Sequence, residues 1–169
     1  MAGKMVRIRI ITGGVNSGKS AKFLRLWREA GARLVNQPAG LYSEKIQGAD
    51  GATIGYNLAL LPSWEILPFA FPRETILPET AGDYYFQGKF AFLQKTFQMA
   101  ERHILRALEP SADGSVWIDE IGNLELKGFG FDALLSAVFK SNREITFTVR
   151  SSLLGNVVAK YGIMACELL

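Results

Sequence analysis

Cysteine and histidine are scarce in this sequence, and their scarcity excludes several kinds of site. The 169 residues include one cysteine, Cys166, so no intrachain disulfide can form and a cysteine-rich zinc site is excluded. With His103 as the single histidine, a histidine-based metal site is not predicted either. We expect Cys166 to pack in the core and His103 to be a partly buried structural residue.

Long apolar runs are also absent. The longest stretch without charge, Gly51–Trp64, is too short to cross a bilayer and is interrupted by glycine, asparagine and proline. The N-terminal sequence MAGKMVRIRI has no apolar signal-peptide core. The remaining composition, 49% hydrophobic and 21% charged, is that of an ordinary soluble protein. We therefore predict a cytoplasmic protein without membrane contact, folded as a single domain over residues 1–169.

Positive charge is concentrated near the N-terminus. The net charge is +3, but residues 1–33 carry eight Lys and Arg against Glu29 alone, which leaves +7 there and −4 in the rest. Lys22, Arg25 and Arg33 follow helical spacing with Glu29, which is typical of a solvated helix face, but the excess also suits a polyanionic ligand. Basic residues are not interleaved with aromatic ones over a wide area, so nucleic-acid binding is not predicted.

Hydrophobic periodicity predicts strands that alternate with helices. The stretches GLYSEKI and ATIGYNLALL, on either side of QGADG, indicate a β-hairpin with a Gly/Asp turn. Strand patterns cover residues 6–12, 115–120, 143–150 and 163–169, and helical patterns cover residues 19–34, 89–109, 131–141 and 151–162. This alternation predicts an α/β fold in which helices flank a central, mostly parallel sheet, with the hairpin added to it.

Residues 62–88 form the least regular part of the pattern. Four of the six prolines (62, 68, 72 and 78) fall in this segment, so a regular helix is not predicted there. We expect an irregular, insertion-like segment with one or two short strands. The stretch WEILPFAF is a candidate edge strand, because proline is tolerated at the edge of a sheet.

A phosphate-binding loop is predicted between the first strand and the first helix. The sequence GGVNSGKS fits the pattern G-x-x-x-x-G-K-[ST] at every fixed position. Glycines let backbone N–H groups curl around a phosphate, Lys19 can bridge the β- and γ-phosphates, and the Ser20 hydroxyl can ligate Mg²⁺. The predicted nucleotide-binding residues are Gly13, Gly14, Val15, Asn16, Ser17, Gly18, Lys19 and Ser20.

Two adjacent acids follow the apolar strand VWI. At the end of a neighbouring strand, Asp119 is predicted to hold Mg²⁺ together with Ser20. A carboxylate directly after it, Glu120, can orient or deprotonate a water beside the γ-phosphate, which favours hydrolysis. Alternatively, Glu120 opens a surface loop. Arg150, at the end of another predicted strand, is either a surface residue or a charge that stabilises the transferred phosphoryl group.

The motif order of the chain resembles the THEP1-type nucleoside-triphosphatases. The segment IDEIGNLEL is similar to that family's acidic motif D-E-I-G-x-M-E-L, with Leu124 in place of the methionine. The hairpin matches its G-hydrophobic-Y-[ST]-E and I-G-[FY] segments through Gly40, Tyr42, Ser43, Glu44, Gly55 and Tyr56. The resemblance covers about residues 6–165 and matches weakly over 62–88.

The resemblance implies a RecA-like P-loop fold and slow, Mg²⁺-dependent hydrolysis of several NTPs to NDP and phosphate. It implies that Gly13–Ser20 bind the phosphates and that Lys19 and Glu120 are catalytic, while the role of Glu125 stays open. Members of this family continue beyond the last strand, whereas this sequence ends at CELL. We therefore expect base recognition to be reduced or to come from a partner chain, which is either another protein or a second copy.

Two other functions remain open at this point. A nucleotide or small-molecule kinase would need an arginine-bearing lid and an acceptor pocket, and the segment 62–88 contains Arg73 as its single arginine. A nucleotide-gated switch or assembly factor would act through a protein partner and use hydrolysis as a timer. The pair Asp119–Glu120 favours water as the acceptor over both alternatives.

Overall fold

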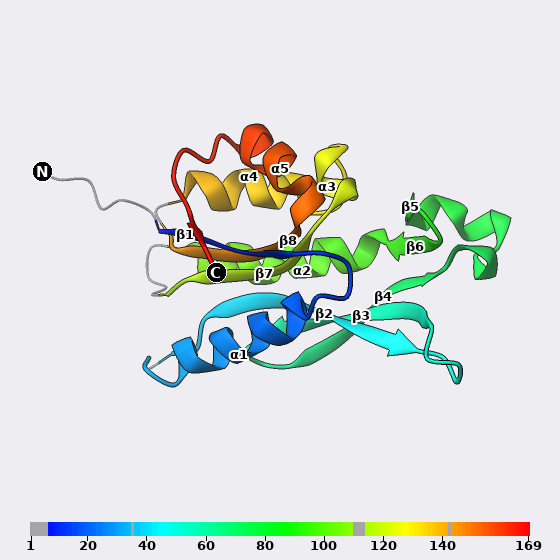
Figure 1. Cartoon of the computed structure of the whole chain (residues 1–169). Helices are drawn as coiled ribbons and strands as arrows, with labels where there is room; N and C mark the ends of the chain where they lie inside the picture. The colour runs from blue at the N-terminus through cyan, green and yellow to red at the C-terminus, as the bar shows by residue number, and fades with distance from the viewer. Residues whose placement is uncertain (1–6, 35, 110–113, 142) are drawn as a thin grey trace, which may run out of the picture.

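The computed structural model of the chain describes residues 7–34, 36–109, 114–141 and 143–169 (Figure 1). Val6, the first residue of a predicted strand, lies outside these ranges, and so do residues 110–113, which follow a predicted helix. Nine strands of the described residues form one sheet in the order β5-β6-β4-β3-β2-β7-β8-β1-β9. Their bounds are β1 (Ile8–Gly13), β2 (Ala39–Gln47), β3 (Thr53–Leu61), β4 (Glu65–Pro72), β5 (Tyr84–Gln87), β6 (Phe90–Leu93), β7 (Val116–Ile121), β8 (Ile145–Arg150) and β9 (Glu167–Leu168).

The helices in the described residues are α1 (Lys19–Gly31), α2 (Gln94–Ala107), α3 (Asn123–Leu126), α4 (Asp132–Lys140) and α5 (Leu154–Tyr161), with short 3₁₀ turns η1 (Arg73–Thr75), η2 (Pro78–Asp83) and η3 (Ser151–Leu153). Four of these helices lie within predicted periodic segments, and the short helix α3 was not predicted. In Figure 1, α1 lies below the central strands, while α3, α4 and α5 lie above them. The predicted α/β architecture with helices on both faces is therefore confirmed.

One half of the sheet is parallel and the other is antiparallel. Strands β9, β1, β8, β7 and β2 run parallel to their neighbours, whereas β3, β4, β6 and β5 extend the sheet in antiparallel pairs. The predicted hairpin is β2 and β3, but its first strand also pairs with β7 and so belongs to the central sheet. The hairpin thus joins the two halves.

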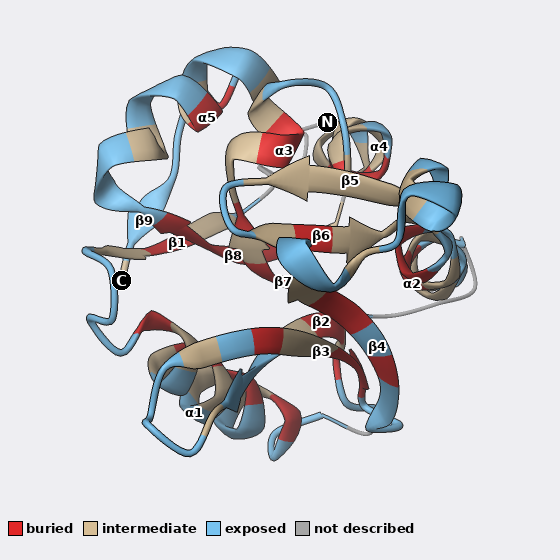
Figure 2. Ribbon diagram, turned by 90° about the vertical axis from the view of Figure 1, so that its right-hand side faces the viewer, coloured by how far each residue is buried: buried red, intermediate tan, exposed pale blue. Residues whose placement is uncertain are grey.

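Alternation along the central strands sends side chains to two separate cores. Ile10 and Ile118 pack with α2, α4 and α5 on one face, whereas Ile11 and Trp117 pack with Phe23 of α1 on the other. All five side chains are at most 1% exposed. Figure 2 shows the same contrast, with buried residues along the central strands and exposed residues on the outer surfaces of the helices. Trp117 is therefore a core residue.

The segment 62–88 contains the strands β4 and β5 and the 3₁₀ turns η1 and η2. The candidate edge strand exists as β4, but it lies between β3 and β6. Proline is tolerated because, within β4, only Ala70–Pro72 pair with β6. Pro68 therefore faces no neighbouring strand on that side, and its carbonyl accepts a bond from Thr96. The predicted helix begins at Gln94 instead of residue 89, because the aromatic stretch before it forms β6.

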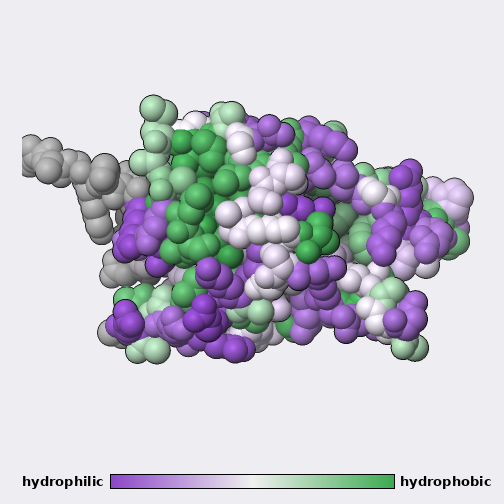
Figure 3. Space-filling view, viewed as in Figure 1, coloured by the Kyte–Doolittle hydropathy of each residue, from purple (hydrophilic) through white to green (hydrophobic). Residues whose placement is uncertain are grey.

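The surface is polar along α1 and more apolar near the C-terminal segment. Figure 3 shows hydrophilic residues at the bottom of the view, where α1 lies, and hydrophobic residues gathered above them at the left. In the C-terminal segment Met164 is 96% exposed and Cys166 is also exposed, so the predicted core position of Cys166 is wrong.

His103 is half-buried and bonds the Leu61 carbonyl, as predicted for a structural histidine. No helix within the described ranges has the length and apolarity needed to cross a membrane.

Candidate active site

The predicted phosphate loop connects the end of β1 to the first turn of α1. Two of its glycines are constrained: Gly18 has φ 83°, a backbone conformation that favours glycine, and a Cβ on Gly13 would lie 2.4 Å from the side-chain atom Ser17 Oγ. The residue after Gly18 begins α1, so the loop places the helix N-terminus, with its partial positive charge, at the edge of the loop. This geometry can hold a phosphate group.

Lys19 is held inside the loop. Its side chain is buried, with 8% of the residue exposed, and Nζ donates to the Gly14 carbonyl oxygen at 2.8 Å. The ammonium group is therefore already directed across the loop and has a single backbone partner. A phosphate oxygen placed in the loop can replace that carbonyl as acceptor.

Asp119 is the buried polar centre of the site. It is 1% exposed, and its Oδ1 accepts hydrogen bonds from Thr148 Oγ1 at 2.6 Å and from Ser20 Oγ at 3.2 Å. Ser43 Oγ donates to the Asp119 carbonyl oxygen at 2.8 Å. Burial raises the pKa of the Asp119 carboxyl to about 6, although the bonds from Thr148 and Ser20 act in the opposite direction. The structure thus brings Ser20 and Asp119 together, as the sequence predicted.

The strand that carries Asp119 is not the direct neighbour of the strand before the loop. β8 lies between β1 and β7, which corrects the prediction of adjacent strands. Thr148 on this intervening strand donates a hydrogen bond to Asp119 on β7. The register of β7 against β8 shifts between Ile118 and Ile121, so Asp119 and Glu120 leave the regular ladder at the carboxyl edge of the sheet.

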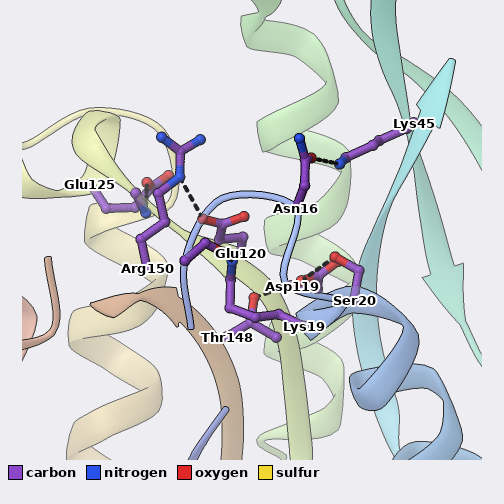
Figure 4. Close-up of polar contacts among 11 residues, drawn as sticks. Asn16, Lys19, Ser20, Lys45, Asp119, Glu120, Glu125, Thr148 and Arg150 are labelled. Atoms are coloured by element: carbon purple, nitrogen blue, oxygen red, sulfur yellow. Dashed lines mark hydrogen bonds and ion pairs between the residues drawn. The ribbon is translucent and has the colours of Figure 1, made fainter. Parts of the chain in front are cut away.

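Glu120 points from this edge toward Arg150. Arg150 Nε lies 3.3 Å from Glu120 Oε1, and the two side chains are 46% and 29% exposed (Figure 4). The arginine comes from the end of β8, where the sequence left its role open between a surface residue and a charge near phosphate. It is an exposed side chain that contacts the candidate base.

A cavity of about 400 Å³ is lined by the loop, both acids and Arg150. The hairpin strands also contribute to it, and sequence reasoning did not assign these residues to the site: Tyr42, Ser43, Lys45 and Tyr56. Lys45 Nζ bonds Asn16 Oδ1 at 2.7 Å and so ties the hairpin to the loop. The hairpin motif of the resemblance includes Tyr42, Ser43 and Tyr56 and was the available signal for these three residues.

Glu125 has a structural role in α3. Its Oε2 accepts the Gly122 N–H at 2.9 Å and its Oε1 accepts the Phe131 N–H at 3.2 Å. The residue is 4% exposed, and burial raises the pKa of its carboxyl. The side chain therefore satisfies backbone donors at the helix start and holds the turn that follows.

The residues at the end of β7 fit a hard divalent cation. Asp119 Oδ2 is buried and has no hydrogen-bond partner among the described residues, and the Ser20 hydroxyl lies beside the same carboxylate. Within the described ranges no cluster of three or more His, Cys, Asp or Glu occurs. A site with one carboxylate and one hydroxyl suits Mg²⁺, which keeps waters and takes further ligands from substrate phosphates.

This fold and site together place the molecule among the P-loop NTPases with a RecA-like sheet, because β8 separates the loop-bearing strand from the strand that carries the acids. A family model described as NTPase matches residues 8–164, and the chain belongs to this family. The predicted resemblance to the THEP1-type nucleoside-triphosphatases is confirmed.

Individual relatives agree with this assignment. The nucleoside-triphosphatase THEP1 of Thermotoga sp. (strain RQ2) is 27% identical over 145 residues, which cover 85% of this chain and 74% of that protein. The crystal structure of THEP1 from the hyperthermophile Aquifex aeolicus has a TM-score of 0.70 at 17% identity, over 96% of this chain and 88% of that one. The solution structure of a human cancer-related nucleoside triphosphatase has a TM-score of 0.65 at 19% identity, over 97% and 88% of the two chains. The two structures show the similarity of the fold.

Proposed function

We propose that the protein hydrolyses nucleoside triphosphates to the diphosphate and phosphate, slowly and with Mg²⁺. The observation that supports this most directly is the position of Glu120. Its carboxylate lines the same cavity as the phosphate loop, directly after the buried Asp119. Thermotoga THEP1, a relative of this chain, is named a nucleoside-triphosphatase.

In this proposal the residues Gly13–Ser20 bind the β- and γ-phosphates through backbone N–H groups, and Lys19 exchanges the Gly14 carbonyl for phosphate oxygens. Glu120 accepts a proton from a water molecule as that water attacks the γ-phosphorus. The bond from the γ-phosphorus to the bridging oxygen breaks, and the diphosphate leaves with the electron pair. The loop amides and Lys19 stabilise the charge that develops on the phosphoryl oxygens.

Ser20 and Asp119 are the proposed holders of Mg²⁺, which when bound neutralises charge on the β- and γ-phosphates. A cation beside Asp119 also favours the ionised form of a carboxyl whose pKa burial has raised. Thr148 keeps that carboxylate in place by donating to the oxygen that Ser20 also contacts. Both donors contact the same oxygen, Oδ1, so the other oxygen of Asp119 would be available to a cation or to its water shell.

Arg150 is proposed as the arginine that acts within the same chain. It lines the 400 Å³ cavity that contains the loop, which we call the nucleotide cavity, and it contacts Glu120. Its guanidinium can therefore move a short way from the carboxylate to a γ-phosphate oxygen. The ion pair occupies one oxygen of the candidate base. This competition supports a slow basal reaction.

The test compares Mg·NTP binding and phosphate release for the wild type and Glu120→Gln. We expect the variant to keep its nucleotide affinity and to lose about 10²–10⁴-fold in turnover, the usual contribution of a general base. Glu44→Gln is the matched control. Glu44 is a carboxylate that lines the same cavity, and the proposal assigns it no role in activating water. Equal phosphate release from the wild type and Glu120→Gln would remove Glu120 from the mechanism.

A further inference from the structure

A second cavity, of about 290 Å³, adjoins the nucleotide cavity on the other side of Glu120. Four residues line both cavities: Ser43, Tyr56, Glu120 and Arg150. The ion pair between Glu120 and Arg150 therefore forms part of the wall between them. Neither the phosphate loop nor Asp119 lines the second cavity, so it is not a part of the phosphate site.

The second cavity combines five aromatic side chains with several polar and charged residues. Phe69 comes from β4, Phe90 and Phe92 from β6, and Phe97 from α2. Tyr56 and Phe90 meet edge to face, with ring centroids 5.3 Å apart. Flat apolar walls of this kind suit a planar ring, and a cavity near 300 Å³ is at the lower end of small-molecule sites.

The polar groups of this cavity suit the edge of a heterocyclic ring. Asn123 and Gln87 contribute side-chain amides from α3 and β5, and Lys89 contributes an ammonium group from the turn after β5. Lys127 Nζ donates to Gln87 Oε1 at 2.7 Å, which leaves the amide nitrogen of Gln87 to donate to a ligand. A few placed hydrogen-bonding groups in an apolar cavity are the usual means of orienting a small ligand.

We propose that the second cavity is an acceptor site for a hydroxyl-bearing heteroaromatic compound of nucleoside size, and that the enzyme transfers the γ-phosphoryl group to that hydroxyl in competition with water. The ring occupies the aromatic walls, and the hydroxyl lies at the wall shared with the nucleotide cavity, beside Glu120. This inference rests on the proposed function, since it uses the same phosphate loop and the same base.

The transfer balances without a further reactant. The acceptor hydroxyl gives its proton to Glu120 while its oxygen forms a bond to the γ-phosphorus. The bond from the γ-phosphorus to the bridging oxygen breaks, and its electron pair stays on the nucleoside diphosphate. Glu120 then returns the proton to solvent. The products are a phosphorylated acceptor and NDP, and no free phosphate is formed in this branch.

The test measures NDP and free phosphate separately, with Mg·ATP alone and with adenosine, guanosine, cytidine, uridine or thymidine at millimolar concentration. Without acceptor, the two products should form in equal amounts. With at least one nucleoside, NDP should exceed free phosphate, and mass spectrometry should detect the nucleoside monophosphate in the amount of the difference. Equal amounts of NDP and phosphate with all five nucleosides would overturn the proposal.

Two outcomes separate this inference from the proposed function. NDP that forms only when a nucleoside is present would support the acceptor site and contradict hydrolysis. NDP and phosphate that form in equal amounts under all conditions would support hydrolysis and contradict the acceptor site. The readout therefore does not confuse failure of one with failure of the other.

Phe90→Ala tests the place of binding, because Phe90 lines the second cavity and not the nucleotide cavity. We expect about tenfold or more loss of nucleoside phosphorylation, as for removal of a stacking partner, with hydrolysis unchanged. Phe86→Ala is the matched control: Phe86 is also a half-buried phenylalanine of the β5–β6 hairpin, but it contacts Arg73 and does not line the cavity. Phe90→Leu keeps an apolar side chain for folding and should lose the same activity. Phosphorylation at the wild-type rate in the Phe90→Leu variant would contradict the assignment.

Discussion

The two cavities on either side of Glu120 are built in different ways. The proposed nucleotide cavity takes much of its wall from one continuous loop, Val15–Ala21, and its charged lining comprises two lysines, three acids and Arg150. The second cavity takes its wall from strands and helices far apart in the sequence, and five aromatic rings contribute to its lining. A site built from one loop is marked by a motif, whereas a site assembled from many elements is not.

The substitution with the largest expected effect weakens binding in the proposed nucleotide cavity and does not touch the second cavity. Lys19→Ala deletes the ammonium group that crosses the loop, and we expect a loss of about 2–5 kcal/mol in Mg·NTP binding, as for removal of one partner of a buried charge pair. Equilibrium binding of a fluorescent nucleotide measures it. Lys22→Ala is the control, since Lys22 lies one turn further along α1 and does not line the cavity. Wild-type nucleotide affinity in Lys19→Ala would contradict the phosphate-loop assignment.

Arg150 belongs to both cavities, and its removal tests the wall between them. We expect Arg150→Ala to lower kcat by about 10²–10³-fold with little change in KM, because the proposed contact forms with charge that develops during reaction. Arg150→Lys should retain part of the rate. Arg143→Ala, just before the other end of β8, is a control with a bond to the Glu109 carbonyl and no contact with Glu120. A change in KM alone would assign Arg150 to ground-state binding instead.

Asp119 belongs to the nucleotide cavity alone and tests its cation site. Asp119→Asn keeps the size of the side chain but removes the charge, and we expect the Mg²⁺ concentration for half-maximal activity to rise about 10–100-fold. Thr148→Val, which removes the 2.6 Å bond to the same carboxylate, should shift it in the same direction by less. A titration of activity against Mg²⁺ at saturating NTP measures both, and an unchanged Mg²⁺ requirement in Asp119→Asn would contradict the assignment.

Glu125 lines the second cavity and supports its wall, so the expected effect is on stability. Glu125→Ala leaves the N–H groups of Gly122 and Phe131 without their acceptor, and we expect a loss of about 1–3 kcal/mol in the free energy of unfolding. Denaturant unfolding measures it, with Glu125→Gln as the isosteric variant that should lose less. If Glu125→Ala unfolds at the wild-type denaturant concentration, these two bonds do not support α3.

The same carboxyl makes a prediction about pH. Burial raises the pKa of Glu125 in the folded protein above its ordinary value of 4.5, so the folded state holds this proton to higher pH than the unfolded chain. The stability that comes from binding this proton is therefore fully present below pH 4.5 and is lost as the pH rises through the raised pKa of the folded state. The difference in unfolding free energy between the wild type and Glu125→Gln should follow this direction, and a difference independent of pH would contradict it.

Elements with a strong local pattern were predicted well, and elements defined by pairing were not. The loop and α1 follow from GGVNSGKS and the apolar stripe that contains Phe23 and Trp27, both buried. The aromatic stretch before Gln94 was assigned to a helix, but it pairs with β4 and β5 as a strand. Helical hydrogen bonds are local and leave a periodic signal, whereas strand partners come from distant residues.

Contiguous motifs were enough to predict the phosphate loop, the acidic pair at the end of a strand, and the family to which the chain belongs. Each is a contiguous motif whose chemistry depends on backbone conformation or on residues next to each other. The three-dimensional fold, in contrast, places β8 between the two halves of the site, brings Thr148 and Ser43 into contact with Asp119, and brings Arg150 to Glu120. It also decided that an aromatic cavity adjoins the base. These features depend on which strands become neighbours, and that is set by the packing of the whole sheet.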